Sequence, residues 1–581
     1  MTTEKELYTN GTQKVVVSLR LKRLLIAIFA SLAISAWVIL QAGGQLPAFR
    51  SSRQNEQPGA SEKNTRCGKT RAIVPSFNGS FDLILHDPEF KKRSIENLAK
   101  AVQIPTEIQD VNPQPSENHE YYRYFYQFHH YLQHTYPLIH KYVTLEKVNE
   151  LGLLYTWQGS EENLKPILFM AHQDVVPVER KTWDSWKYPP FSGYYDEETD
   201  LLWGRGSNDC KNLLTAEMDA IEQLLKDGFK PRRTVLMSFG FDEESSGHLG
   251  AHNLALFLKE RYGKDGIYSI IDEGFGVISL GDDLYVAAPI NGEKGYADVV
   301  FTVNGHGGHS SVPPDHTTIG VAAELITLLE KYTFDFDFEV DNPLYGLLTC
   351  VAEHSELVPE SLKKTILGAS GDSKKKAALE SYLATDPRFR ELIRTTRAVD
   401  IIEGGVKSNA LPEVASFLIN HRIEIHSSVN ETMEHDLKYA KEIAKKHGYG
   451  LSYNNNTIEP ETDLGFIEVS VTYGLEPAPM SPSSGPVWDL FAGTIQNVFE
   501  NGVFAEDPEA DFYISTTLIS GNTDTRYYWD LSKFIYRFVG SLMDPEILKT
   551  LHSVDEHVDI SGHLSATAFI YEYVINASEN I

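Results

Sequence analysis

Cysteine is scarce in this chain of 581 residues, which contains only three. Because Cys67, Cys210 and Cys350 cannot all pair with one another, the sequence excludes a disulfide-rich scaffold and permits at most one internal bridge. Cys67 with Cys350 is the only pairing that we consider, because Cys210 directly follows Asp209, a candidate metal ligand discussed below.

Basic residues are outnumbered by acidic ones. The chain has 52 Lys and Arg against 81 Asp and Glu, which gives a formal net charge of -29. Such a charge repels a phosphate backbone, so the composition argues against nucleic acid as a partner. An acidic surface is otherwise ordinary for a soluble domain and carries no information about mechanism.

Long apolar runs are rare too, and one segment stands out. Residues 24–40 (LLIAIFASLAISAWVIL) are uncharged and just long enough to span a bilayer as a helix. Arg20, Lys22 and Arg23 precede this run, so the positive-inside rule predicts a cytosolic tail (1–23) and a transmembrane signal anchor (24–40) of a single-pass type II membrane protein. The alternative is a cleaved signal peptide. The length of the run and the poor cleavage site in the following QAGGQLPAF favour the anchor.

Four acceptor sequons for N-glycosylation lie on the predicted lumenal side of the anchor. They begin at Asn78, Asn430, Asn455 and Asn576. A single sequon is a weak signal because the pattern is common by chance. Together the four agree with the predicted topology, so we predict a glycoprotein.

The remaining chain changes character several times. Residues 41–76 are rich in Ser, Gln, Asn and Gly without an apolar period, which predicts an extended stem. From Lys165 onward, strand patterns alternate with helical ones, which indicates an α/β fold with a central, mostly parallel sheet. From about Gly292 the strands become longer and alternate in polarity, as in a small α+β unit that contains a charged helical insertion. We therefore predict a main domain formed by residues 77–291 and 481–581, interrupted by an inserted lid domain at 292–480.

Polar residues end three of the predicted strands of the main domain. The apolar run ILFM leads into His172 and Asp174, TVLMSFGF leads into Glu243 and Glu244, and YSII leads into Asp272. Open α/β sheets bind their ligands at the carboxyl ends of their strands, so these side chains are expected to meet at one edge of the sheet.

These residue types suit a metal site. His172 and Asp174 share one face of an extended segment, so Asp174 can hold one ring nitrogen while the other binds a metal. Neighbouring acids such as Glu243 and Glu244 repel one another unless a cation neutralises them. Asp209 precedes an apolar helix, whose N-terminus favours a carboxylate. Taken singly, each could be a solvated loop residue or a helix cap.

In order and approximate spacing, the whole set resembles the M20 family of metallopeptidases, over about residues 166–559. The motif consists of His172-x-Asp174, Asp209, Glu243-Glu244, Asp272 and finally His552 in LHSVDE. The resemblance implies a zinc-exopeptidase-like catalytic domain and two Zn²⁺ per subunit. The implied ligands are Asp209 between the two ions, His172 with Asp272 on one ion, and Glu244 with His552 on the other.

The resemblance also implies roles beyond the ligands. Glu243 would be the general base, a role that needs a carboxylate near the metals but not bound to them. His309, in the lid sequence VNGHGGHSS, would donate to the developing oxyanion. Asn409 and Arg422 of the lid and Arg526 of the main domain would hold the substrate, since an Arg fork is the natural partner of a free carboxylate.

The resemblance thus implies a dizinc carboxypeptidase that removes the C-terminal residue of short peptides. It is strongest to the anchored vacuolar members of the family, which implies a vacuolar, lysosome-like membrane or lumen. Two alternatives remain at this point: an N-acyl-amino-acid hydrolase or synthase of the same family, and a non-catalytic receptor-like glycoprotein. The sequence leaves the oligomeric state open.

Overall fold

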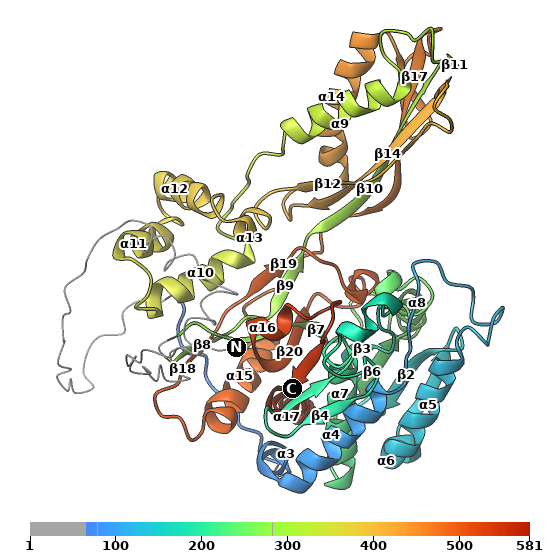
Figure 1. Cartoon of the computed structure of the whole chain (residues 1–581). Helices are drawn as coiled ribbons and strands as arrows, with labels where there is room; N and C mark the ends of the chain where they lie inside the picture. Colours follow the sequence, from blue (N-terminus) through green and yellow to red (C-terminus); the bar gives the residue numbers. More distant parts are fainter. Residues whose placement is uncertain (1–65, 78, 282, 581) are drawn as a thin grey trace, which may run out of the picture.

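The computed structural model describes residues 66–77, 79–281 and 283–580 (Figure 1). The predicted cytosolic tail, the anchor, most of the stem and Asn78 lie outside these described residues and stay predictions. Within the described part of the chain, no helix is both long enough and apolar enough to cross a membrane.

The main domain is built on a mixed sheet of ten strands. Its central strands β6, β3, β7 and β20 run parallel, and antiparallel pairs flank them. The main path, in spatial order, is β1 (Thr144–Val148), β2 (Gly152–Trp157), β6 (Val235–Gly240), β3 (Ile167–His172), β7 (Ser269–Ser279), β20 (Ile535–Met543), β9 (Ile290–Glu293) and β19 (Thr517–Ile519), with β8 (Leu284–Ala287) and β18 (Asp511–Ile514) paired beside it.

Helices cover both faces of this sheet, which explains why β3 and β6 are buried along their whole length and largely apolar. Alternate residues of β3 enter different cores: Ile167 and Phe169 pack with α7 (Lys211–Lys226) and α17 (Ile560–Glu579), and Leu168 and Met170 pack with α8 (Ala251–Tyr262). Strands buried on both faces are continuous apolar runs, as the sequence of these segments indicates.

Shorter elements complete the main domain. They are α3 (Phe81–His86), α4 (Pro88–Val102), α5 (Arg123–Thr135), α6 (Pro137–Tyr142), α15 (Pro486–Val498), α16 (Pro545–Leu548) and the three-stranded sheet of β21 (His557–Asp559), β5 (Leu201–Trp203) and β4 (Tyr194–Asp196).

A second sheet of six strands forms the lid, which stands away from the main domain in Figure 1. Buried and half-exposed residues alternate along β10 and β14, because helices α9 and α14 cover only one face. The order is β12 (Thr396–Gly404), β14 (Val414–Ile423), β10 (Gly295–Gly305), β17 (Gly465–Leu475), β15 (Gly450–Tyr453) and β16 (Asn456–Glu459), with α9 (Thr318–Lys331), α14 (Val429–His447) and the small ladder β11 (Gly308–His309) and β13 (Ala410–Leu411).

The charged helical insertion predicted at about residues 359–397 follows helix α10 (Pro343–His354). It consists of α11 (Glu360–Gly368), α12 (Ser373–Leu383) and α13 (Pro387–Arg390). Leu347 and Val351 of α10 pack against Ile278 and Val286 of the main sheet, because this face of α10 is apolar. Helix α10 therefore rests on the main domain, although its sequence lies within the predicted lid at 292–480.

The predicted stem is also too long at its C-terminal end. Cys67 forms a disulfide with Cys350, which confirms the pairing considered from the sequence. The Ile73 N–H donates to the Gly493 carbonyl, and Ser76 donates to the Glu579 carboxylate. Residues 66–76 are thus attached to the main domain by backbone and side-chain contacts that a count of apolar residues does not reveal.

One predicted glycosylation site is wrong. Asn576 lies in α17 with 0% of its surface exposed, and its amide donates to the Ile73 carbonyl and the Thr494 hydroxyl. A glycan cannot attach there in the folded protein, because the asparagine is enclosed by the core. Asn430 and Asn455 are exposed on the lid and remain predicted sites.

We expect buried Glu572 of α17 to make stability depend on pH. Burial raises the pKa of this carboxyl from 4.5 to about 7, so the folded state favours the protonated form. Its contribution to stability is full below pH 4.5 and is lost as pH rises through about 7. Glu572→Gln should match the wild type near pH 4.5 and exceed its unfolding free energy by up to about 3 kcal/mol above pH 7, measured by denaturant titration. Parallel curves for both proteins across this range would contradict the assignment.

Candidate metal centre

Segments distant in sequence bring the candidate ligands to the carboxyl edge of the main sheet. His172 ends β3, Glu243 and Glu244 follow β6, and Asp209 lies just before α7. His552 comes from the loop between α16 and β21. This edge is where open α/β sheets place ligands, as the sequence predicts.

Asp209 is at the centre of the group. One carboxylate oxygen, Oδ1, lies 3.0 Å from His172 Nε2, and the other, Oδ2, lies 3.1 Å from His552 Nε2. His552 Nε2 is also 3.2 Å from Glu244 Oε1. A carboxylate that presents one oxygen to each of two imidazoles can bridge two cations, with His172 on one side and His552 on the other.

Glu273, rather than the predicted Asp272, lies beside His172. The distance from Glu273 Oε2 to His172 Nε2 is 3.6 Å. Among the described residues, the side chains close enough to share a metal form two clusters, neither of which includes Asp272: His172 with Cys210 and Glu273, and His172 with Asp209 and Glu244. The predicted strand end was wrong, because β7 continues through both acids to Ser279. Successive side chains of a strand point to opposite faces, so only one of the two can face His172. Asp272 instead lies near the charges of Arg537 and Glu293.

Cys210 is a further neighbour of His172 and Glu273 that sequence reasoning left without a role. Ligand atoms of these three residues lie within 4.8 Å of one another. Burial, followed by the charge of Glu273, raises the pKa of the Cys210 thiol well above its usual value. The peptide bond between Asp209 and Cys210 is cis.

Asp174 lies beside the ring nitrogen of His172 that is not directed at Asp209. His172 Nδ1 lies 3.0 Å from the Asp174 carbonyl and 3.4 Å from its carboxylate Oδ1. A proton held at Nδ1 by these oxygens leaves the lone pair of Nε2 directed at the centre. The other carboxylate oxygen of Asp174 accepts from the Glu244 N–H at 3.0 Å, which connects the segments that follow β3 and β6.

Glu556 is a positioning residue that sequence reasoning missed. Its Oε1 accepts from the backbone N–H groups of Gly206, Asn208 and Asp209 at 3.0, 3.1 and 3.2 Å, and its Oε2 pairs with Arg205 at 2.5 Å. The Glu556 carboxylate therefore connects the turn that contains Asp209 to the segment that follows His552. The available signal was its place in LHSVDE, only four residues after His552.

The electrostatics of the group fit bound cations. Burial, followed by the charge of Asp209, raises the pKa of Glu244 to about 7, and burial with the charge of Glu273 raises that of Glu243 well above its usual range. Glu244 Oε1 is buried, and it has the His552 imidazole at 3.2 Å but no well-aligned hydrogen bond. Acids in such a place are stabilised as carboxylates by nearby positive charge. Two imidazoles and three carboxylates are a donor set that suits Zn²⁺.

Glu243 lies next to this donor set without belonging to it. It is absent from the groups of possible metal ligands found among the described residues, and its Oε1 lies 4.0 Å from Arg526 Nη2. Its side chain is largely buried. This position suits a group that exchanges a proton beside the metals.

Arg526 lies close to Glu243, and Arg422 lies close to Arg526. Arg422 Nη1 on β14 donates to Asn522 Oδ1 at 3.2 Å, and Asn522 precedes the short helical turn Asp524–Tyr527 that carries Arg526. Burial lowers the pKa of the Arg422 guanidinium, and the nearby positive charge of Arg526 lowers it further. Both predicted carboxylate-binding residues therefore lie at the junction of lid and main domain.

His309 and Asn409 are not brought to the metal centre within one chain. Both are exposed beside the β11 and β13 ladder, where the Ser310 N–H donates to the Asn409 carbonyl at 3.3 Å. Figure 1 shows β11 at the end of the lid that points away from the main domain. The long strands β10 and β14 carry this tip outward, a geometry that motif spacing alone does not contain.

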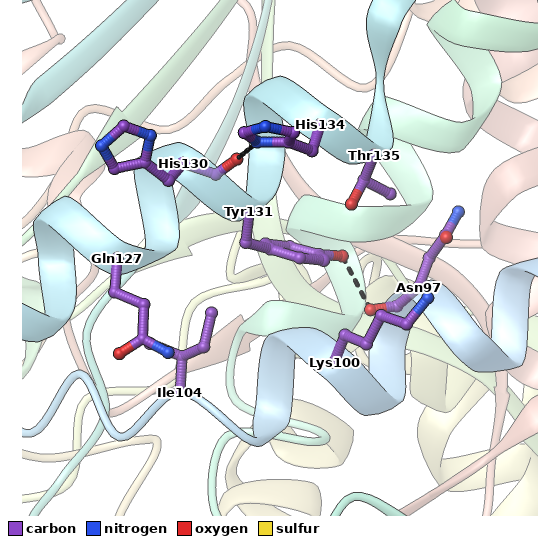
Figure 2. A pocket seen from close by; sticks show the side chains of 8 residues that line it. All are labelled: Asn97, Lys100, Ile104, Gln127, His130, Tyr131, His134 and Thr135. Atoms are coloured by element: carbon purple, nitrogen blue, oxygen red, sulfur yellow. Dashed lines mark hydrogen bonds between the residues drawn. The ribbon is translucent and has the colours of Figure 1, made fainter.

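A hollow of about 570 Å³ elsewhere on the main domain is separate from this centre (Figure 2). It lies between α4 and α5 and contains no acidic side chain. Its lining residues are Asn97, Lys100, Ile104, Gln127, His130, Tyr131, His134 and Thr135. None of the candidate ligands contributes to it.

Comparisons with known proteins agree with this geometry. Residues 168–576 match the family described as Peptidase family M20/M25/M40. The chain belongs to this family of metal-dependent, typically zinc-dependent peptidases. More particularly, it is a homologue of Carboxypeptidase S of Saccharomyces cerevisiae, with 62% identity over 515 residues that cover 88% of this chain and 89% of that protein.

Other relatives extend the comparison. The N-fatty-acyl-amino acid synthase/hydrolase of Homo sapiens is 31% identical over 457 residues, covering 77% of this chain and 81% of that protein. Among solved structures, a di-peptidase from Saccharomyces cerevisiae matches with a TM-score of 0.55 at 15% identity, covering 86% of this chain and 98% of its own. An M20 family metallo-carboxypeptidase from Sulfolobus solfataricus matches with a TM-score of 0.54 at 17% identity, covering 84% and 99%. These two structures show the shared fold.

The distinction between Glu273 and Asp272 can be tested by metal binding. We expect Glu273→Gln to weaken zinc affinity by more than the roughly 10- to 100-fold that loss of an outer-shell partner costs, because a direct ligand is lost. Asp272→Asn is the matched neighbour and should bind zinc more tightly than Glu273→Gln. Competition with a chromogenic chelator measures both affinities. The opposite order would restore Asp272 as the ligand.

Proposed function

We propose that this protein is a two-metal carboxypeptidase that hydrolyses the C-terminal peptide bond of short peptides. The observation that carries the proposal is the position of Asp209, with one oxygen toward each of two imidazoles and Glu243 buried beside them. The 62% identity to Carboxypeptidase S supports the same activity.

Five residues would hold the two ions. Asp209 would be shared, His172 and Glu273 would complete one site, and Glu244 and His552 would complete the other. When bound, the ions would lower the pKa of a shared water and polarise the scissile carbonyl.

Glu243 would move the proton during the reaction. A free carboxylate oxygen of Glu243 accepts the proton of the attacking water and passes it to the amine that leaves. Its position outside the ligand groups keeps it available for this exchange. Burial of its side chain excludes bulk water from the transfer.

Arg422 and Arg526 would bind the terminal carboxylate of the substrate. An arginine fork matches a carboxylate in geometry and charge. Because Arg526 Nη2 lies only 4.0 Å from Glu243, the carboxylate would sit about one residue from the reacting bond, since one residue spans roughly 3.3–3.6 Å. This spacing favours removal of a single C-terminal residue.

A second candidate is hydrolysis of N-acyl amino acids. Such substrates also present an amide next to a free carboxylate, so the same residues would serve. The relatives that carry this description are 29% to 31% identical, well below Carboxypeptidase S, which favours the peptide substrate. Turnover of a blocked dipeptide and of a fatty-acyl amino acid by the purified full-length protein, with and without chelator, distinguishes the two.

We also propose that the catalytic part lies in a vacuolar, lysosome-like lumen behind an N-terminal anchor. The apolar run at residues 24–40 and the exposed sequons at Asn430 and Asn455 support this topology. A receptor without catalysis is disfavoured because every ligand position retains a metal-binding residue type.

Glu243→Gln should abolish turnover while two metals stay bound. We expect kcat to fall by about 10²–10⁴ because the general base is lost while the ligands are unchanged. Glu572→Gln replaces another buried glutamate outside the centre and is the control for activity. Steady-state kinetics with metal analysis of the same samples measures both effects. Substantial residual turnover in Glu243→Gln would refute the assignment of the base.

Arg422→Gln and Arg526→Gln should each weaken recognition of the free carboxylate. A hydrogen bond to a charged group contributes about 1.5–3 kcal/mol, so kcat/KM should fall roughly 10- to 100-fold for peptides with a free C-terminus. Activity on the same peptides with a C-terminal amide should change little, because they lack the carboxylate. Arg261→Gln, which removes a surface pair with Glu146, is the control. An equal loss on both substrates would contradict carboxylate binding.

A further inference from the structure

Gln173 lies between the metal-centre residues His172 and Asp174 but points the other way, into the protein. It is 0% exposed. Its amide nitrogen donates to the carbonyls of Leu151, Phe239 and Gly240 at 2.9, 3.0 and 3.1 Å. One side chain thus satisfies backbone acceptors beside β2 and at the end of β6.

These bonds lie where the parallel ladder between β3 and β6 ends. The Gln173 N–H also donates to the Gly240 carbonyl, at 3.0 Å. Beyond Gly240 the chain turns into Asp242, Glu243 and Glu244. The side chain of Gln173 therefore extends the connection between the strand that presents His172 and the strand that presents the base and a ligand.

His129 of α5 fixes the orientation of the Gln173 amide. Lys147 Nζ lies 3.0 Å from His129 Nδ1, and an ammonium group can only donate, so Nδ1 accepts. His129 Nε2 then carries the proton and donates to Gln173 Oε1 at 2.8 Å. With its oxygen occupied in this way, the amide directs its nitrogen to the three carbonyls.

The surroundings of His129 keep it in this form. It is 8% exposed, and burial, followed by the charge of Lys147, lowers its pKa to about 3. His130 and the Leu151 backbone also face the ring. The backbone of Gln173 is held as well, because the Thr106 hydroxyl donates to the Gln173 carbonyl at 2.6 Å.

We propose that Gln173 and His129 are positioning residues that set the placement of His172 relative to Glu243 and Glu244. Neither side chain contacts a metal-binding side chain directly. They act through the backbone, so their loss loosens the centre and weakens metal binding as well as turnover. The turnover part of this inference rests on the proposed function, and the metal-binding part does not.

Gln173→Met tests the inference, because methionine keeps the length and shape of the side chain and removes its donor and acceptor. We expect zinc affinity to fall roughly 10- to 100-fold, as for other outer-shell partners of metal sites. We expect kcat to fall and KM to change little, since the substrate-binding arginines are untouched. Zinc affinity is measured by chelator competition well below the unfolding temperature.

Gln223→Met is the matched control. Gln223 of α7 is 3% exposed and its amide donates to Ser80 Oγ and Asp227 Oδ1, away from the centre. It should lower the unfolding midpoint about as much as Gln173→Met does, and leave zinc affinity at the wild-type value. The comparison separates loss of a buried amide from loss of positioning.

His129 provides an independent test of the same chain of bonds. His129→Gln keeps a donor and an acceptor and should retain most of the zinc affinity, whereas His129→Leu should lose it as Gln173→Met does. The double variant should be little worse than either single one, because both act through one chain of contacts. If Gln173→Met does not fold, His129→Leu carries the test.

Wild-type zinc affinity in both Gln173→Met and His129→Leu would overturn the inference. Additive losses in the double variant would overturn the proposed chain from His129 through Gln173. Failure of the proposed function has a different signature: the wild type would bind zinc yet hydrolyse neither peptides nor acyl amino acids, while the change in zinc affinity would still test Gln173 and His129.

Discussion

The structure depends on the cost of burying acidic groups at one edge of a sheet. Asp209, Glu243, Glu244 and Glu273 gather where β3 and β6 end beside β7, and burial raises the pKa of the three glutamates. Two imidazoles offset part of this charge, and divalent cations would offset the rest. Because the parts come from distant segments, the fold must hold each of them: Glu556 fixes Asp209, Asp174 fixes His172, and Gln173 joins the two strands.

A second group of buried charges connects the centre to the lid. Glu293, at the end of β9, is 0% exposed and accepts from Thr523 and Arg537. The next residue, Lys294, donates to the carbonyls of Glu391 and Arg394, and its own carbonyl accepts from Asn522. The residues at which the lid begins are thus hydrogen-bonded to the short segment that leads to Arg526. This connection explains how a strand of the lid can place Arg422 beside a residue of the main domain.

Much of the candidate site could be predicted because strand ends are visible in sequence. The runs that end at His172 and before Glu243 are apolar throughout, and a helix follows Asp209, so their places at the sheet edge followed directly. The family resemblance implied Asp272 as the ligand, and the strand was expected to end at this residue. The strand instead continues to Ser279, and the alternation of side chains then decides which acid faces His172. Glu556 and Gln173 were missed because they act through backbone groups, which no residue pattern displays.

The sequence by itself determined the family, the α/β class of the main domain and the polarity of its strand ends, whereas it only made Cys67 with Cys350 the pairing to consider. Apolar periodicity, charge and residue order are local properties, so they can be identified directly from the sequence. Only the tertiary structure decided that Glu273 faces His172, that Asn576 is enclosed, that α10 packs on the main domain, and that His309 lies far from the metal centre of its own chain. Each of these depends on which surfaces meet after folding, and that is set by packing between segments distant in sequence.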